Sequence, residues 1–151
     1  MQVSQRGLDL IKEFEGCKLT AYLCPAKVWT IGWGSTQHED GRPVRQGDTI
    51  TQAEADALLE SKVSKVYAPA VDGMIRPTVS LTQCQFDALV SFAYNCGIGA
   101  LKRSSLLLTV NANPNDPLIE FKFKQWTKGG GKVLTGLERR RAAEVALYFS
   151  S

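Results

Sequence analysis

Three residues near the N-terminus carry groups that could together perform hydrolysis: the carboxyl of Glu15, the thiol of Cys24 and the hydroxyl of Thr30. Spacings of three and four residues place Leu8, Ile11 and Glu15 on one face of a helix. Apolar surroundings disfavour the ionised form of a carboxyl group, and a carboxyl that keeps its proton can act as a general acid. The plainer alternative is a glutamate at the edge of the core that pairs with an arginine or reaches water.

Cys24 and Thr30 are ambiguous when each is taken alone. A thiol beside a carboxyl can act as a nucleophile or, once ionised, as a base, and a threonine hydroxyl can orient a water molecule. The structural alternatives are a small apolar residue beside a turn for Cys24 and an ordinary strand residue for Thr30. If the hairpin that carries them packs on the end of the first helix, one cleft would hold both residues and Glu15.

The sequence does not favour a metal or cofactor site. The four cysteines lack C-x-x-C spacing, and His38 is the single histidine, so we predict no zinc site. The glycines at 129–131 follow a predicted helix rather than a strand, which favours a flexible turn over a phosphate-binding loop. We therefore expect no metal and no cofactor.

The spacing of the three residues is more specific than the residues themselves. Eight residues separate Glu15 from Cys24, five separate Cys24 from Thr30, and the run Thr30-Ile31-Gly32-Trp33-Gly34 follows. Two further segments come later in the chain, QFDALVSFAYNCG at 85–97 and a stretch with Trp126, Gly129-Gly130, Leu134, Gly136-Leu137 and Arg139-Arg140-Arg141. Together these motifs resemble the phage-type lysozyme family (glycoside hydrolase family 24, the endolysins and muramidases of tailed phages) over nearly the whole chain.

The resemblance implies an endolysin that hydrolyses the β-1,4 bond between N-acetylmuramic acid and N-acetylglucosamine in bacterial peptidoglycan and so lyses the host cell. Glu15 matches the catalytic acid of the family, and Thr30 matches the threonine that positions the attacking water. Cys24 stands where many members have Asp. A thiol with an ordinary pKa of about 8.5 is mostly neutral at pH 7, so either the local field lowers its pKa or the position matters less as a base. The resemblance implies inversion, which the cysteine leaves open.

The resemblance also implies an arginine that pairs with Glu15. This residue is Arg139 or Arg140, and we favour Arg139; for Arg141 we favour a solvated helix face. The tryptophans beside Thr30 either belong to the core or line a sugar cleft. The candidates for the substrate cleft are Trp29, Trp33 and Asn95.

Two other functions are alternatives to the muramidase. A thiol peptidase would pair Cys24 with His38, but His38 lies in a charged turn with nothing to fix its orientation. A non-enzymatic binder of wall glycan or nucleic acid would use the arginines and tryptophans and release no product.

Helix and strand signals outline the first third of the chain. A helix is predicted to follow Ser4 as N-cap and to end at Gly16. Alternating apolar residues at 19–23 and 29–33, on either side of a Pro-containing turn, predict a β-hairpin. A third short strand or turn is expected around 43–47.

The rest of the chain reads as helical. Capping boxes begin at Thr51, Thr82 and Thr135, and the helix after Thr51 is expected to stop near Pro69. Further helices are predicted at about 98–111, from Pro117 to the glycines at 129–131, and at 137–149. We predict a mainly helical α+β, lysozyme-like fold in a single domain, 1–151. Its parts are a β-hairpin lobe at about 14–51, a connecting helix at about 52–68, and a helical lobe at about 69–151 that includes the first helix.

Composition sets the remaining expectations. The chain has 151 residues, 44% of them apolar, with 18 Lys and Arg against 15 Asp and Glu. One domain of this size and a net charge of +3 favour a mildly anionic partner such as the cell wall, without nucleic acid. The polar N-terminus predicts a protein made in the host cytoplasm, without stable membrane insertion. The resemblance implies release at lysis to the periplasm and cell wall through a separate pore-forming protein, and we expect a monomer. We favour free thiols, although Cys17 and Cys24 bracket one strand and could pair on oxidation.

Overall fold

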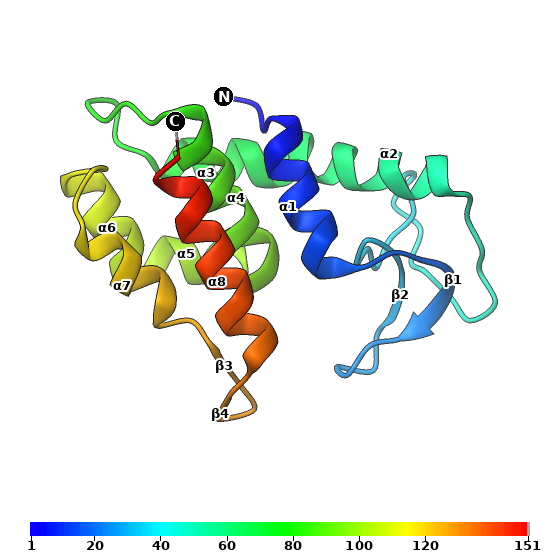
Figure 1. Cartoon of the computed structure of the whole chain (residues 1–151). Helices are drawn as coiled ribbons and strands as arrows, with labels where there is room; N and C mark the ends of the chain where they lie inside the picture. The colour runs from blue at the N-terminus through cyan, green and yellow to red at the C-terminus, as the bar shows by residue number, and fades with distance from the viewer. Residues whose placement is uncertain (151) are drawn as a thin grey trace.

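The chain folds into a small β-hairpin region beside a larger group of helices (Figure 1). We describe it from a computed structural model, which covers residues 1–150. The elements are α1 (Gln5–Glu15), β1 (Lys18–Leu23), β2 (Trp29–Gly32), α2 (Gln52–Lys62), the π-helix η1 (Val63–Tyr67), α3 (Ala68–Met74), α4 (Gln83–Cys96), α5 (Ile98–Arg103), α6 (Ser105–Ala112), α7 (Leu118–Lys124), β3 (Lys128–Gly129), β4 (Lys132–Val133) and α8 (Thr135–Tyr148). The predicted mainly helical α+β class is confirmed.

Helix α1 begins and ends as the sequence predicts. Ser4 has extended backbone at the N-cap, and Gly16 ends the helix with a φ of 68°, a conformation that glycine adopts at little cost. Leu8 and Ile11 are buried. Glu15 is therefore the last residue of a helix anchored by its apolar face.

Strands β1 and β2 form the predicted antiparallel hairpin. Tyr22 lies opposite Thr30, and the register shifts between Lys18 and Tyr22. The turn closes through the Lys27 N–H, which donates to the Cys24 carbonyl at 2.8 Å. Of the short strand or turn predicted around 43–47, the structure has the turn: the Asp48 N–H donates to the Arg45 carbonyl at 3.1 Å. The described chain forms no strand there, only an isolated bridge from Gln37 to Pro43, because a proline cannot donate to a β-ladder.

Two of the three predicted capping boxes are confirmed. Thr51 and Thr82 each accept a bond from the backbone N–H three residues on, and the side chain at that position bonds back. The third prediction is wrong: Thr135 is the first residue of α8, Leu134 occupies the N-cap, and the cap has no side-chain bond within the described residues. Helix α8 therefore starts before the expected residue 137.

Two predicted helix boundaries are also corrected. The helix from residue 52 does not stop near Pro69 but continues through η1 into α3, since a widened π turn can absorb a missing backbone donor. The helix expected at 98–111 is two helices. Ser104 has extended backbone and its hydroxyl accepts from the Leu107 N–H at 3.0 Å, which starts α6 afresh.

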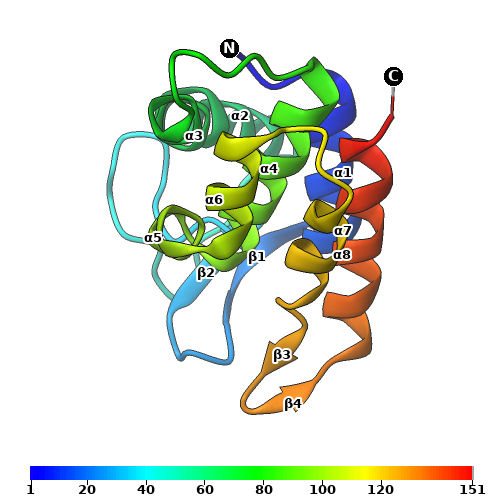
Figure 2. The same ribbon diagram turned by 90° about the vertical axis from the view of Figure 1, so that its left-hand side faces the viewer.

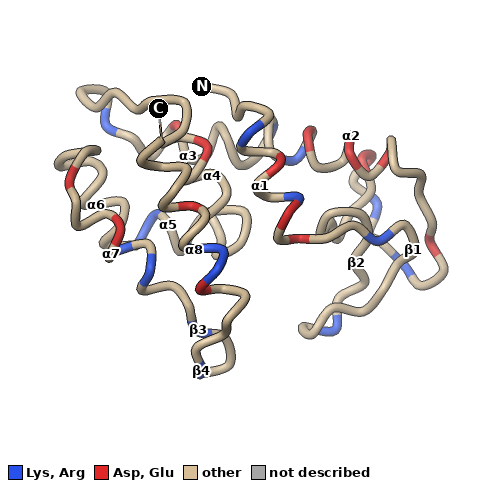
Figure 3. The backbone as a smooth tube through the Cα atoms, viewed as in Figure 1, with Lys and Arg blue, Asp and Glu red and all other residues tan. Residues whose placement is uncertain are grey.

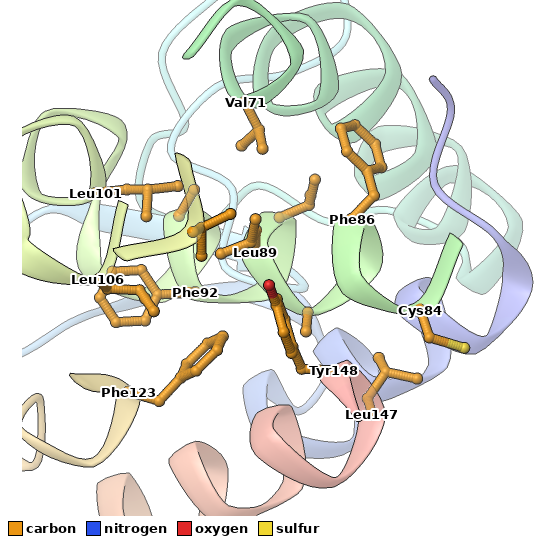
Figure 4. Close-up of a cluster of buried hydrophobic side chains, with 14 of the residues drawn as sticks. Val71, Cys84, Phe86, Leu89, Phe92, Leu101, Leu106, Phe123, Leu147 and Tyr148 are labelled. Carbon is orange, nitrogen blue, oxygen red and sulfur yellow. The ribbon is translucent and has the colours of Figure 1, made fainter. Parts of the chain in front are cut away.

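Helix α4 forms the centre of the helical region, with α8, α1, α5 and α3 packed against it, and Figure 2 shows helices on several sides of it. Its residues from Cys84 to Ala93 are buried. The core around it holds Phe86, Phe92 and Phe123 together with Tyr148 of α8 (Figure 4). A long apolar helix such as 85–93 becomes fully buried when neighbours cover every face.

A second, smaller cluster lies under the hairpin. Ile31, Val44 and Leu58 are buried there, joined by Ala21, Trp29 and Ile50. Leu58 and Leu59 of α2 face different clusters, so α2 connects the two regions. No helix in residues 1–150 has the length and apolar character needed to cross a membrane.

Candidate active site

Glu15 lies at the C-terminal end of α1 with a fifth of its side chain exposed (20%). Its carboxylate pairs with the guanidinium of Arg140, a residue of α8 that is 3% exposed. Gly34 lies against the other side of the carboxylate, where an added Cβ would come within 3.1 Å of Glu15 Oε1, and its φ is 98°. Glycine at 34 therefore leaves the space that the carboxylate occupies.

Three phenols surround this carboxylate. Burial raises the pKa of Tyr22, Tyr67 and Tyr94, and the negative charge of Glu15 raises each further. The hydroxyl of Tyr94 donates to the carbonyl of Trp33 at 2.7 Å, which joins α4 to the segment after β2. The phenols therefore stay neutral near pH 7 and add no charge beside Glu15.

The β-hairpin carries the thiol and the hydroxyl. The cross-strand pair of Tyr22 and Thr30 places the hydroxyl opposite a tyrosine that feels the charges of both Glu15 and Cys24. Thr30 is buried, and its Oγ donates to the Val28 carbonyl at 3.0 Å, which leaves the lone pairs of this oxygen to accept. The structure thus brings the three predicted residues around Tyr22.

The hairpin turn favours an ionised thiol at Cys24. A backbone hydrogen bond from Val28 is the main cause that lowers the pKa of Cys24, with a smaller contribution from the Ala26 backbone. Hydrogen bonds to the anion stabilise the thiolate over the thiol. The cysteine is thus closer to a base at neutral pH than an ordinary thiol.

A pocket of about 520 Å³ opens beside Glu15 and Arg140. Its walls come from the end of α1, the end of α4 and the start of α8, with lining residues Glu13, Phe14, Glu15, Asn95, Leu134, Gly136, Leu137, Arg139 and Arg140. The mixture of apolar and charged groups suits a polar ligand with apolar faces, such as a sugar. In residues 1–150 no three His, Cys, Asp or Glu side chains gather as a metal-ligand group.

Comparison with known proteins shows which family the chain belongs to. The sequence pattern of the phage lysozyme family matches residues 12–144. The chain belongs to the phage lysozyme family. It is 45% identical over 152 residues to an endolysin of Bacillus phage PZA, with 99% of this chain and 56% of that protein covered.

Solved structures agree on the fold. An endolysin from Escherichia coli O157:H7 phage FAHEc1 superimposes with a TM-score of 0.89 at 38% identity, covering 99% of this chain and 94% of that one. The muramidase domain of SpmX from Asticaccaulis excentricus superimposes with a TM-score of 0.85 at 35% identity, covering 99% of both chains. Our chain spans little more than half the length of the Bacillus phage endolysins that it matches.

The prediction of which arginine pairs with Glu15 is corrected by the structure. Arg140 makes the ion pair, whereas the favoured Arg139 is exposed on the pocket wall. Arg141, expected on a solvated face, is completely buried. The reason is helical phase: the inward face of α8 carries residues 140, 141, 144, 145 and 148, and three consecutive arginines do not reveal that phase.

Of the three candidates for the substrate cleft, only Asn95 lines the pocket beside Glu15. Asn95 lies on the pocket wall, and its Oδ1 accepts from Arg141 Nη2 at 2.7 Å. Trp33 packs against the large core and donates from Nε1 to Asp56 at 2.9 Å, and Trp29 packs against the small cluster. Both indoles are thus engaged in packing, away from the pocket beside Glu15.

Two further arrangements bear on the cysteines and on His38. Cys17 and Cys24 are free thiols at opposite ends of β1. Six strand residues span about 20 Å, whereas a disulfide needs Cα atoms within about 7 Å. The alternative in which these two cysteines pair on oxidation is therefore incompatible with this strand. His38 Nε2 lies 2.8 Å from Asp48 Oδ2, so the imidazole is bound to the loop that holds Asp48.

Sequence reasoning missed the residues behind Arg140. Ser91 and Glu144 are completely buried and contact each other at 2.6 Å. The signal was present: a Glu four residues after an Arg on one helix is a pairing distance, and a serine lies within the most apolar helix. Neither signal alone predicts that the Ser91 hydroxyl contacts the Glu144 carboxylate.

Proposed function

We propose that this chain hydrolyses the β-1,4 bond between N-acetylmuramic acid and N-acetylglucosamine in peptidoglycan. The observation that carries the proposal is the partly buried Glu15 carboxyl, fixed by Arg140 at the edge of a pocket. Its charge and that of Cys24 both reach Tyr22, the hairpin residue that lies opposite Thr30. A glycosidase needs an acid and a base or nucleophile on either side of the scissile bond. The family membership and the muramidase among its structural relatives support the same substrate.

In the proposed reaction, protonated Glu15 gives its proton to the glycosidic oxygen as the bond to the anomeric carbon breaks. A water molecule that donates to the Thr30 Oγ attacks that carbon, and its second proton passes to the Cys24 thiolate. The lowered pKa of Cys24 supports this base role. Direct attack by water inverts the anomeric configuration, so the first product is an α-anomer, which proton NMR of a fresh digest detects.

Product analysis of digested peptidoglycan tests the proposal. Purified sacculi incubated with the protein should yield fragments with new reducing ends on muramic acid, read by borohydride reduction and mass spectrometry. New free amines instead of reducing ends would indicate the thiol peptidase, and a His38→Ala variant would then be inactive. Binding to sacculi without any product would indicate a non-enzymatic wall protein.

Host lysis and the route by which the protein reaches the wall are part of the same proposal. A muramidase of a phage would lyse the host by cutting the wall, and we propose that it reaches the wall through a membrane pore made by a separate phage protein. Fractionation of infected cells before lysis tests this route. Protein found in the membrane fraction before lysis would contradict it.

A further inference from the structure

A buried ionic cluster lies directly behind the pocket. The Glu144 carboxylate is fully buried between two arginines: Arg141 Nε lies 2.8 Å from its Oε1, and Arg140 Nε lies 3.4 Å from its Oε2. Ser91 Oγ from α4 donates to the same Oε2 at 2.6 Å. A carboxylate removed from water needs such partners, because an unpaired buried charge is very costly.

Each arginine in this cluster reaches a different residue of the pocket wall. Arg140 pairs with Glu15, and its Nη2 also donates to the Ser91 carbonyl at 3.2 Å. Arg141 Nη2 donates to Asn95 Oδ1 at 2.7 Å, and its guanidinium lies 5.0 Å from the centre of the Phe92 ring. With the amide oxygen of Asn95 held, its NH₂ group is what remains to donate to a ligand.

From this arrangement we infer that Glu144 is a positioning residue for two pocket groups, fixing Glu15 through Arg140 and Asn95 through Arg141. The inference rests on the proposed function, in which Glu15 is the acid. One buried carboxylate thereby sets the spacing between the proton donor and a sugar-binding amide, which lie on different helices.

The charge on Glu144 also determines how strongly Arg140 attracts the Glu15 carboxylate. Arg140 is now shared by two carboxylates, Glu15 from α1 and Glu144 from its own helix. Other ionisable groups near Glu15 are the phenols of Tyr22, Tyr67 and Tyr94, which are neutral near pH 7. Glu13 and Arg139 line the same pocket as Glu15, and the charge of Cys24 reaches Tyr22 from the hairpin. Loss of the negative charge at 144 would leave Arg140 to Glu15 alone.

The pH dependence of turnover tests this inference. In Glu144→Gln, stronger attraction to Arg140 favours ionised Glu15, so the proton donor is lost at lower pH. We expect the alkaline limb of the kcat profile on peptidoglycan to move down by about half to one pH unit, and KM to rise severalfold as Asn95 loosens. Glu144→Asp, which keeps the charge, should restore the limb toward wild type. An unchanged limb and KM, with only a lower melting temperature, would overturn the inference.

A milder pair of variants covers the case in which Glu144→Gln does not fold. Ser91→Ala removes one hydroxyl from the cluster, and we expect kcat to fall about three- to tenfold through looser positioning. Ser104→Ala removes a similarly buried serine that caps α6, away from the pocket. It should lower the melting temperature while kcat at 25 °C stays at the wild-type value. Equal kcat in Ser91→Ala and Ser104→Ala would contradict the inference.

These measurements separate the two proposals. If the wild-type protein releases no reducing ends, the proposed function fails before Glu144 is considered. If it releases them and the variants at 144 and 91 keep the wild-type kcat, KM and pH profile, only the positioning role fails.

Discussion

The thiol of Cys24 sits in a hairpin turn that supplies hydrogen bonds to its sulfur, at a position where the resemblance to the family implies an aspartate. An aspartate would be ionised at neutral pH without help, whereas a thiol needs those bonds to become a base. In the proposed mechanism the turn from Cys24 to Val28, with Lys27 at a φ of 62°, therefore prepares the base as well as connecting the strands.

Alkylation as a function of pH tests this view of Cys24. Because the turn lowers the pKa of Cys24 and burial raises the pKa of Cys96, Cys24 should react with iodoacetamide at a lower pH than Cys96. Mass spectrometry of peptides from protein labelled across pH 6 to 10 gives both midpoints, with about 8.5 as the ordinary thiol value. A common midpoint for the two cysteines would show that the turn does not activate the thiol.

Gly34 provides a second test at the scale of one residue. Gly34→Ala puts a methyl group against Glu15 Oε1 and requires a φ of 98°, so we expect about 1–2 kcal/mol lower stability and a large loss of kcat. Gly41→Ala is the matched control, because its φ is 89° and no atom lies within 4 Å of the added methyl. Similar stability loss in both, with kcat lost only in Gly34→Ala, is the expected result. Equal activities would mean that the contact with Glu15 is unimportant.

The places of Glu15 at the end of α1 and of Cys24 and Thr30 on one hairpin could be predicted from the sequence, but the arginine that pairs with Glu15 could not. Glu15 could be predicted because its spacing from Leu8 and Ile11 fixes its face, and Gly16 fixes the end of the helix. Arg139 and Arg140 could not be separated, because neighbouring residues of one type carry no periodicity. Only the packing of α8 on α4 decides which of them points inward.

Helix α8 shows how an element sets the site. Its first turn lines the pocket through Gly136 and Leu137, and its second brings Arg140 to Glu15. A shift of one residue, about 100° of rotation, would turn Arg140 away from α1. The residue at which α8 begins therefore decides whether Arg140 reaches Glu15.

The caps of three helices give a prediction at the scale of elements. Thr51→Ala and Thr82→Ala each break a capping box and should cost about 1 kcal/mol of unfolding free energy. Thr135→Ala should cost only a few tenths, because Thr135 lies inside α8 and takes no part in its cap. Urea unfolding of the three variants measures this. A loss at Thr135 as large as that at Thr82 would contradict the observed start of α8.

Elements were predictable where the signal is local. The hairpin, α1 and the two confirmed capping boxes each follow from a few adjacent residues. The division at Ser104 and the π-helix before Pro69 depend on how the chain packs around α4. The short β3–β4 hairpin at the expected glycine break was not predicted, because strands of two residues have no pattern of their own.

The whole molecule separates its charges along the chain, as Figure 3 shows for the backbone. Residues 98–141 hold nine Lys and Arg against three Asp and Glu, while the remainder holds nine against twelve. The net +3 therefore understates the positive character of segment 98–141, which includes α7, β3, β4 and the start of α8. This segment borders the pocket, so an anionic wall would be drawn to the correct side.

Removal of charge from the β3–β4 hairpin tests the effect on wall binding. Lys128→Gln with Lys132→Gln should reduce the initial rate on sacculi by about two- to fivefold at low salt, with the difference vanishing near 1 M salt where charges are screened within about 3 Å. Lys65→Gln, an exposed lysine of η1, is the control and should keep the wild-type rate. A deficit that persists at high salt would show that the hairpin acts by something other than its charge.

The central claim is that Glu15 is the proton donor, and one comparison tests it most directly. Glu15→Gln keeps the shape of the side chain and removes the acid, whereas Glu13→Gln changes an exposed carboxyl on the same pocket wall. Release of reducing ends from peptidoglycan should fall about 10²- to 10⁴-fold in Glu15→Gln and stay within about threefold of wild type in Glu13→Gln. Wild-type rates in a folded Glu15→Gln variant would contradict the claim.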